Sequence, residues 1–420
     1  MTFSLFGTKF TRHSGIAQLM DDMNDGLRTP GAIMLGGGNP AAIPAMEAYF
    51  HDLCRSMLDE GTLAEALCNY DGPQGKNALL TALAALLRKE LGWPVTEKNI
   101  ALTNGSQSAF FYLFNLYAGR AKDGSLRKVL FPLAPEYLGY ADAGLEENMF
   151  VSTKPNIARL PDGQFKYHVD FDHLQVGGDI GLICVSRPTN PTGNVITDQE
   201  LLRLDALARQ HNIPLLIDNA YGLPFPGIIF SEATPLWNPN IILCMSLSKL
   251  GLPGARCGIV VANEDVIAAI TNLNGIISLA PGGIGPALAT AMIRRGDLIR
   301  LSASVIGPFY QQRVTQTMAL LRRYLSPERC LIHKPEGAFF LWLWFQDLPI
   351  TTEILYQRLK QRGVLMVPGH YFFPGLEPDW PHAHQCMRMN YVPAADKLEQ
   401  GIAILAEEVE RAHREAVSHA

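Results

Sequence analysis

The chain has 420 residues, of which 48% are hydrophobic and 18% charged, and its formal net charge at pH 7 is −5. This composition predicts a large buried core and excludes an intrinsically disordered chain. No basic block is present, so nucleic acid is not an expected partner. No run approaches the ~20 apolar residues of a membrane span, so no membrane association is expected. The N-terminus lacks the charged and apolar regions of a signal peptide, which predicts a cytoplasmic protein.

The 7 cysteines are scattered along the chain, and no CxxC pair is present. An odd number without paired spacing argues against both a disulfide framework and a zinc site. We interpret the cysteines as reduced, mostly buried thiols and expect no metal.

The first two thirds of the chain show alternating helical and strand patterns. Residues 1–35 predict an arm that leads into a short strand, leucines at helical spacing predict a helix over 76–91, and a capping box opens another helix at Thr197. Short apolar runs occur between the helices, at 128–131, 180–185, 213–217, 241–245 and 257–262. Nearly continuous apolar strands between helices predict an α/β fold, with a mostly parallel sheet covered by helices. In such sheets, ligands bind at the carboxyl ends of the strands.

The pattern changes after about residue 310. A long helix over 308–324 is followed by a Trp/Phe-rich strand over 338–345, a Gly/Pro-rich loop over 367–381, a strand over 387–391 and a final helix from 395. These elements predict a smaller α+β domain that also includes the N-terminal segment. The expected organisation is an arm and part of the small domain over 1–50, a large domain over 51–310 and a small C-terminal domain over 311–420.

The segment from Ser246 to Arg256 carries the most specific signal. Lys249 lies just past a predicted buried strand, with Ser246 and Ser248 beside it and Arg256 seven residues later. A lysine in this position can bind an aldehyde cofactor covalently, while the hydroxyls and the arginine hold the phosphate of that cofactor. This is the chemistry of a pyridoxal 5'-phosphate (PLP) lysine. A surface lysine in a Gly/Pro loop is the alternative.

Polar residues that follow two other apolar runs fit the same cofactor. Asp218 can keep a proton on a pyridine nitrogen, and Tyr221 can donate to the phenolic oxygen of the ring. Asp218 can equally cap the next turn. The Asn190 amide can donate to the ring oxygen and to a substrate carboxylate, although Asn190-Pro-Thr-Gly193 is also an ordinary turn.

Weaker signals come from other segments of the chain. Ser106 and Gln107 open an apolar helix, whose N-terminus suits a phosphate. Tyr137 can stack on a flat ring or pack in a core. Arg388 lies in an apolar strand and needs a partner, either an internal carboxylate or an amino-acid substrate. Gly38, in a glycine run, lets the backbone approach a ligand or belongs to an ordinary loop.

The order of these motifs along nearly the whole chain resembles the fold-type I PLP enzymes, in particular the class I/II aminotransferases. The resemblance implies that Lys249 carries PLP, that Asp218 binds the pyridine nitrogen and that Tyr221 binds the phenolic oxygen. It implies phosphate contacts from Ser106, Gln107, Ser246, Ser248 and Arg256, stacking by Tyr137, and binding of the substrate carboxylate by Arg388 with Asn190 and Gly38. It also implies a homodimer in which Tyr70 reaches the phosphate in the partner subunit.

Within this family, the stretches over 35–44 and 186–193 resemble enzymes that exchange the amino group between L-valine and pyruvate through pyridoxamine phosphate. The resemblance therefore implies this reaction. The expected side-chain pocket is apolar, with candidates around Ile16 and the glycine run, and lacks a second arginine. The alternatives are another aliphatic or aromatic amino-acid donor, a fold-type I lyase and a PLP-binding regulator. A regulator needs a DNA-binding module, and no basic helix-turn-helix precedes the matched region.

Overall fold

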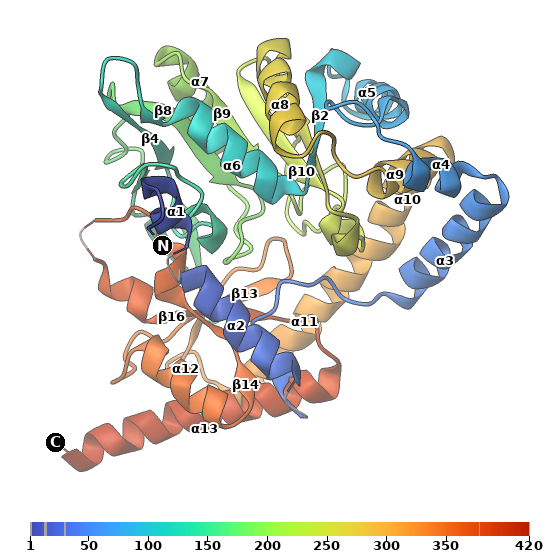
Figure 1. Cartoon of the computed structure of the whole chain (residues 1–420). Helices are drawn as coiled ribbons and strands as arrows, with labels where there is room; N and C mark the ends of the chain where they lie inside the picture. The colour runs from blue at the N-terminus through green and yellow to red at the C-terminus, as the bar shows by residue number, and fades with distance from the viewer. Residues whose placement is uncertain (1, 12–14, 29–30, 378, 420) are drawn as a thin grey trace.

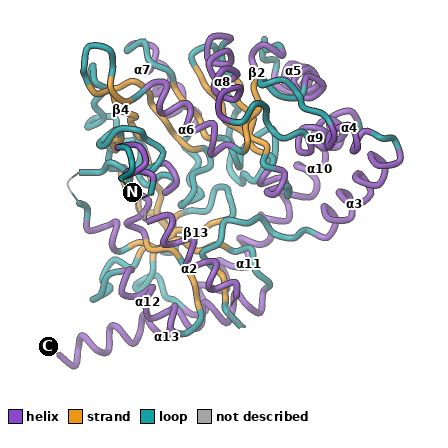
Figure 2. Tube along the Cα trace, in the orientation of Figure 1, coloured by secondary structure: helices purple, strands orange, loops and turns teal. Residues whose placement is uncertain are grey.

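The computed structural model describes residues 2–11, 15–28, 31–377 and 379–419. Two lobes are visible in Figure 1, one built on β2, β4, β8, β9 and β10, the other containing β13, β16, α12 and α13. Figure 2 shows strands inside both lobes and helices around them. The chain is therefore an α/β protein, as its sequence predicts.

The larger sheet has eight strands within the described residues, and its order is β2-β11-β10-β9-β8-β4-β3, with β5 paired to β4. The pairings from β10 through β9, β8 and β4 to β5 are parallel, whereas β11 and β3 pair antiparallel to their neighbours. Every one of the predicted apolar runs forms a strand. The strands are β2 Ile100–Asn104, β3 Gly119–Arg120, β4 Leu126–Phe131, β5 Phe150–Ser152, β8 Ile180–Ser186, β9 Leu215–Asp218, β10 Ile241–Ser246 and β11 Cys257–Val261.

Helices cover both faces of this sheet because its strands are apolar on both sides. Leu216 and Ile242 pack in one cluster with side chains of α6 and α8, while Leu215 and Ile217 belong to the cluster that includes α5, α7 and α9. The capping box at Thr197 is present at the start of α7. The helices are α5 Asn77–Leu91, α6 Ser106–Tyr117, α7 Asp198–Gln210, α8 Glu264–Ile277 and α9 Ile284–Arg294.

The smaller sheet has the order β15-β16-β13-β12-β7-β6. Its β6 and β7 come from the middle of the chain, whereas the other strands follow residue 330. The strands are β6 Asn156–Leu160, β7 Gln164–His168, β12 Leu331–His333, β13 Phe340–Trp344, β15 Val367–Pro368 and β16 Cys386–Asn390. A separate two-stranded parallel sheet joins β1 Ile33–Met34 to β14 Val364–Leu365. The N-terminal segment therefore contacts the C-terminal third of the chain, while the predicted domain boundaries stay a prediction.

The N-terminal segment is more regular than the expected arm. It contains α1 Leu5–Phe10 and α2 Gly15–Arg28, and α2 lies at the junction of the two lobes in Figure 1. The remaining helices are α3 Pro44–Asp59, α4 Thr62–Cys68, α10 Asp297–Leu301, α11 Gly307–Tyr324, α12 Thr352–Gln361 and α13 Ala395–His419. A π-helical turn Ser302–Ile306 links α10 to α11, and single 3-10 turns lie at Glu97–Asn99, Leu138–Tyr140, Ser248–Leu250, Pro253–Ala255, Gly369–Phe372 and Pro381–His384.

Two further properties concern the whole described chain. None of its described helices is both long enough and apolar enough to cross a membrane. All the cysteines are free, and most of them are buried. Burial raises the pKa of the Cys184 and Cys244 thiols well above the usual range, which makes these cysteines unreactive core residues.

Candidate active site

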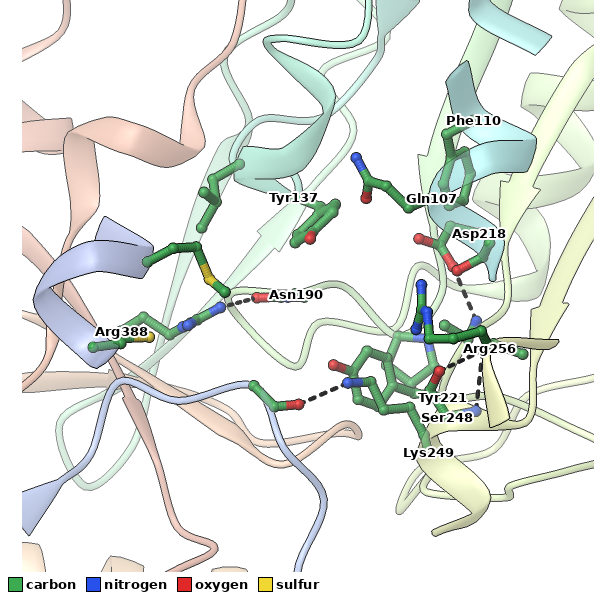
Figure 3. A pocket seen from close by; sticks show the side chains of 18 residues that line it. Gln107, Phe110, Tyr137, Asn190, Asp218, Tyr221, Ser248, Lys249, Arg256 and Arg388 are labelled. Carbon is green, nitrogen blue, oxygen red and sulfur yellow. Dashed lines mark hydrogen bonds between the residues drawn. The ribbon is translucent and has the colours of Figure 1, made fainter. Parts of the chain in front are cut away.

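A cavity of about 250 Å³ lies where the carboxyl edge of the larger sheet meets the smaller sheet (Figure 3). All of the site residues predicted from the sequence except Tyr70 line this cavity: Gly38, Ser106, Gln107, Tyr137, Asn190, Asp218, Tyr221, Ser246, Ser248, Lys249, Arg256 and Arg388. These residues are far apart in the sequence and come together only in the fold.

The parallel strands explain this convergence. β8, β9 and β10 run in the same direction, with Ser186 opposite Asp218 and Asp218 opposite Cys244. Their carboxyl ends therefore reach the same edge of the sheet. The segments that follow β8 and β10 supply Asn190 and Lys249, so one edge presents an amide, a carboxylate and an amine.

Lys249 lies in the 3-10 turn Ser248–Leu250, directly after β10. Its Nζ donates a hydrogen bond to the Gly38 carbonyl at 2.8 Å and lies 5.5 Å from the centroid of the Tyr221 ring. Burial, assisted by the nearby Arg388 and Arg256 guanidinium groups, lowers the pKa of Lys249 to about 8, although the Asp218 carboxylate opposes this shift. The amine is thereby closer to its neutral, nucleophilic form than an ordinary lysine.

Asp218 faces the cavity from the end of β9. Its Oδ2 accepts a hydrogen bond from the Tyr140 hydroxyl at 2.6 Å, and its Oδ1 accepts one from the Ala220 N–H at 3.0 Å. Burial raises the pKa of Asp218, while both hydrogen bonds and Lys249 act in the opposite direction. The contact from Tyr140 was not anticipated from the sequence. The spacing of Tyr137 and Tyr140 could have indicated this contact, because residues three apart in a helical turn lie on the same side of it.

A further part of the lining, formed by Ser246, Ser248 and Arg256, is suited to an anion. The Ser248 N–H donates to Ser246 Oγ at 3.1 Å, and the Ser246 hydroxyl donates to Ser248 Oγ at 3.0 Å. The Arg256 guanidinium packs against Gly105, where a Cβ atom would lie only 2.2 Å from Nη2. Gly105 directly precedes α6, so Arg256 and the N-terminus of this helix present positive charge together with Ser106 and Gln107. The donor set fits a phosphate group.

Arg388 lies in the central part of β16 and has no carboxylate partner among the described residues. Its Nη1 donates to Asn190 Oδ1 at 2.7 Å, its Nη2 donates to the Gly36 carbonyl at 2.6 Å, and its buried Nε has no partner. The guanidinium lies 4.3 Å from the centroid of the Phe340 ring. Burial lowers the pKa of Arg388 to about 10. The sequence left two possible partners for Arg388, an internal carboxylate and an amino-acid substrate. Among the described residues, no internal carboxylate contacts Arg388.

Tyr137 and Tyr221 lie on different sides of the cavity (Figure 3). The Tyr137 ring makes an edge contact with Tyr140, with centroids 5.3 Å apart. The Tyr221 ring packs in the same manner against Phe339, at 5.3 Å. Both tyrosines are therefore packed on one side and still exposed to the cavity on the other.

Apolar residues that were not named from the sequence complete the lining. Met20 and Met23 come from α2, and Leu138 comes from the loop after β4. The side chain of Ile16, which was expected here, lies outside the described residues. Arg256 and Arg388 are the arginines among the described lining residues, and Arg388 lies beside α2, the helix that supplies the two methionines (Figure 3).

Tyr70 lies outside the cavity, directly beyond α4. Its side chain is 86% exposed, and the nearby Leu67 is also exposed. Neither residue contributes to the cavity of its own chain. The role of Tyr70 in the site of a partner subunit stays a prediction.

Comparison with known proteins identifies the family. The model of the family "Aminotransferase class I and II" matches residues 51–404. The chain is 74% identical, over 99% of its length and 100% of the relative, to a valine–pyruvate aminotransferase of Escherichia coli K12. It is 26% identical, over 91% of its length and 89% of the relative, to aromatic-amino-acid aminotransferase 1 of Thermococcus litoralis.

A solved structure agrees with this match. The crystal structure of a valine–pyruvate aminotransferase from Salmonella typhimurium LT2 superposes with a TM-score of 0.90 at 72% identity, and the match covers 96% of this chain and 100% of that one. The fold-type I architecture expected from the motif order is thereby confirmed. The chain belongs to the class I and II aminotransferases.

Proposed function

We propose that this protein is a PLP-dependent transaminase that exchanges the amino group between L-valine and pyruvate, giving 3-methyl-2-oxobutanoate and L-alanine. The observation that carries the proposal is the buried Arg388, which has no carboxylate partner in the described part of the chain and lines the same cavity as Lys249. A buried guanidinium is costly without an anion, and an amino-acid or keto-acid carboxylate is its natural bidentate partner.

The residues of the cavity fit PLP. Ser246, Ser248 and Arg256, together with the start of α6, would hold its phosphate, Asp218 would accept a hydrogen bond from its protonated pyridine nitrogen, and Tyr137 and Tyr221 would contact its ring. When bound, PLP supplies an aldehyde that reacts with amines and a ring that takes up electrons from the substrate Cα.

The chain itself contributes the acid–base and binding steps. Arg388 and Asn190 hold the substrate carboxylate, which places the substrate Cα on the Lys249 side of the cavity. With its lowered pKa, the Lys249 Nζ can accept the proton from Cα as a general base and return it as a general acid. The amino-acid and keto-acid half-reactions share one site, so we expect ping-pong kinetics.

The proposed substrate pair rests on the apolar wall as well as on the relatives. Met20, Met23 and Leu138 offer no charge to a substrate side chain, which suits valine and alanine. Discrimination by one methyl group in an apolar pocket is worth only about 1–3 kcal/mol. We therefore expect weaker activity on neighbouring aliphatic amino acids such as 2-aminobutyrate.

The proposed assembly is a cytoplasmic homodimer. Exposed apolar side chains at Leu67, Tyr70, Ile276, Ile277 and Leu279 support a protein interface on this side of the chain. Free, mostly buried cysteines are typical of a reducing compartment.

The test is the visible absorption spectrum of the purified protein with PLP, followed by addition of valine and then pyruvate. We expect a cofactor band that valine bleaches and pyruvate restores. A band that valine leaves unchanged would retain PLP binding but contradict valine as a substrate. Release of product from valine without a keto-acid acceptor would indicate a lyase, and absence of any band would contradict the assignment of Lys249.

A further inference from the structure

A second acidic residue lies behind Asp218, away from the cavity. Glu136, between Pro135 and Tyr137, is fully buried. Its Oε1 accepts a hydrogen bond from the Ser186 N–H at 2.8 Å, and its Oε2 lies 2.5 Å from the Ser186 hydroxyl. No lysine, arginine or histidine of the described chain forms an ion pair with it. The ionisable groups that face it are Asp218, Tyr140 and Cys184.

Glu136 is linked to Asp218 through two hydroxyl groups. Ser186 Oγ, which contacts Glu136, lies 3.3 Å from the Tyr140 hydroxyl oxygen. The Tyr140 hydroxyl in turn contacts Asp218 Oδ2 at 2.6 Å. Three oxygen–oxygen contacts therefore join the two carboxyl groups, and both hydroxyls between them are buried.

A count of protons shows what this chain of contacts requires. To be a hydrogen bond, each contact needs one proton, but Ser186 and Tyr140 supply only two, and the contact between these two hydroxyls is the longest of the three at 3.3 Å. If both carboxyl groups are ionised, each hydroxyl points at its own carboxylate, and the contact between Tyr140 and Ser186 has no proton. One additional proton on either acid gives every contact a donor and makes the chain run in one direction.

The surroundings decide which acid holds that proton. Asp218 borders the cavity, where Lys249 provides positive charge and where the proposed pyridine nitrogen would bind. Glu136 is enclosed in the core and has no cation beside it, so an ionised form would carry the full cost of desolvation. In agreement with this, burial raises the pKa of Glu136 to about 8, although the hydrogen bonds from Ser186 act in the opposite direction, and the Asp218 charge makes a smaller contribution that raises it.

We propose that Glu136 is a positioning residue that is protonated at neutral pH and directs a one-way chain of hydrogen-bond donors, through Ser186 and Tyr140, at an ionised Asp218. In this arrangement the Glu136 acid donates to Ser186, Ser186 donates to Tyr140, and Tyr140 donates to Asp218. The chain stabilises negative charge on Asp218 from the side opposite the cofactor. The functional consequence rests on the proposed binding of PLP, whereas the protonation of Glu136 does not.

The first experiment measures that protonation in the protein without PLP. The infrared difference spectrum of wild type minus Glu136→Gln at pH 7 should contain the carbonyl band of a protonated carboxylic acid, and the band should disappear at alkaline pH. The matched control is Asp142→Asn, which changes an exposed acid in the same loop and should show no such band. A difference spectrum with only carboxylate bands would overturn the proposal, whatever the outcome for PLP.

The second experiment measures PLP affinity in variants. Glu136→Gln keeps a neutral N–H donor toward Ser186, whereas the similarly sized Glu136→Leu removes it. We expect Glu136→Leu and Tyr140→Phe to weaken PLP binding about tenfold or more, as for loss of a hydrogen bond to a charged group. Glu136→Gln should recover most of the affinity lost in Glu136→Leu.

Two outcomes of the affinity experiment separate the hypotheses. Equal losses in Glu136→Gln and Glu136→Leu would show that a carboxylate is required and would contradict a neutral Glu136. If Glu136→Leu does not fold, Tyr140→Phe still tests the link to Asp218, because unchanged PLP affinity in that variant would contradict it. If wild type itself fails to bind PLP, the proposed function is wrong, and the infrared result still decides the state of Glu136.

Discussion

Arg388 and Asn190 contact each other across the two sheets, with Arg388 Nη1 donating to Asn190 Oδ1 at 2.7 Å. Arg388 belongs to β16 of the smaller sheet, and Asn190 follows β8 of the larger one. Because the amide oxygen of Asn190 faces Arg388, its amide nitrogen can face the cavity as a donor. One contact therefore orients both groups that we propose to hold the substrate carboxylate.

Replacement of Arg388 should reduce the reaction of substrates that have a carboxylate. The variant Arg388→Lys keeps the charge but loses the bidentate geometry, so we expect kcat/KM for valine to fall about 10²-fold. The matched measurement uses 2-methylpropylamine, which is valine without its carboxylate. The slow reaction of this amine with the bound cofactor should change little in the variant, and an equal loss for both substrates would contradict the proposed contact.

Removal of Lys249 should abolish transamination while leaving the fold intact. The variant Lys249→Ala lacks both the covalent attachment point and the general base, so we expect a loss of at least about 10³-fold in kcat. Mass spectrometry after borohydride reduction should show PLP attached to wild type and not to the variant. Lys98→Ala, which replaces an exposed lysine of the 3-10 turn Glu97–Asn99, is the control and should behave as wild type.

The capture of PLP by the apoenzyme should depend on pH through Lys249. Only the neutral amine attacks an aldehyde, and burial lowers the pKa of Lys249 to about 8. The rate should therefore rise up to about pH 8 and then level off, whereas the rate for an ordinary lysine would continue to rise up to its usual pKa of 10.5.

The lowered pKa of Lys249 also predicts how the stability of the fold depends on pH. Between about pH 8 and 10.5, the unfolded chain holds a proton on Lys249 that the folded chain has lost, so Lys249 makes the fold more stable as pH rises.

Arg388 is one of the groups that lower the pKa of Lys249. In Arg388→Gln, the midpoint of PLP capture should move to higher pH, and an unchanged midpoint would exclude this electrostatic coupling.

The proposed role of Tyr70 can be tested by mixing two defective chains. If Tyr70 completes the site of the partner subunit, a mixed dimer of Lys249→Ala and Tyr70→Ala contains one intact site and one doubly defective site. Random pairing then restores about a quarter of the wild-type activity, because half of the dimers are mixed and each has one good site. Activity no higher than the average of the separate variants would place Tyr70 outside the partner's site.

The sequence by itself determined the elements and most of the chemistry. Apolar runs such as 241–245 must be buried, and helical spacing and capping residues limit the helices, so the strands of the larger sheet and helices such as α5 and α7 follow from local patterns. Lys249, Asp218 and Asn190 were identifiable because parallel strands present their carboxyl ends at one edge. Residue type and position relative to a strand were sufficient for these predictions.

Only the tertiary structure decided which groups are partners. Nothing local shows that Arg388 meets Asn190, or that β6 and β7 join a sheet whose other strands lie more than 150 residues later. The helices of the N-terminal segment place Met20 and Met23 at the cavity, and Glu136 contacts Asp218 only through Ser186 and Tyr140. The physical reason is that burial and pairing of polar groups depend on segments distant in the chain, and the cost of an unpaired buried charge selects among the possible partners only once the fold is formed.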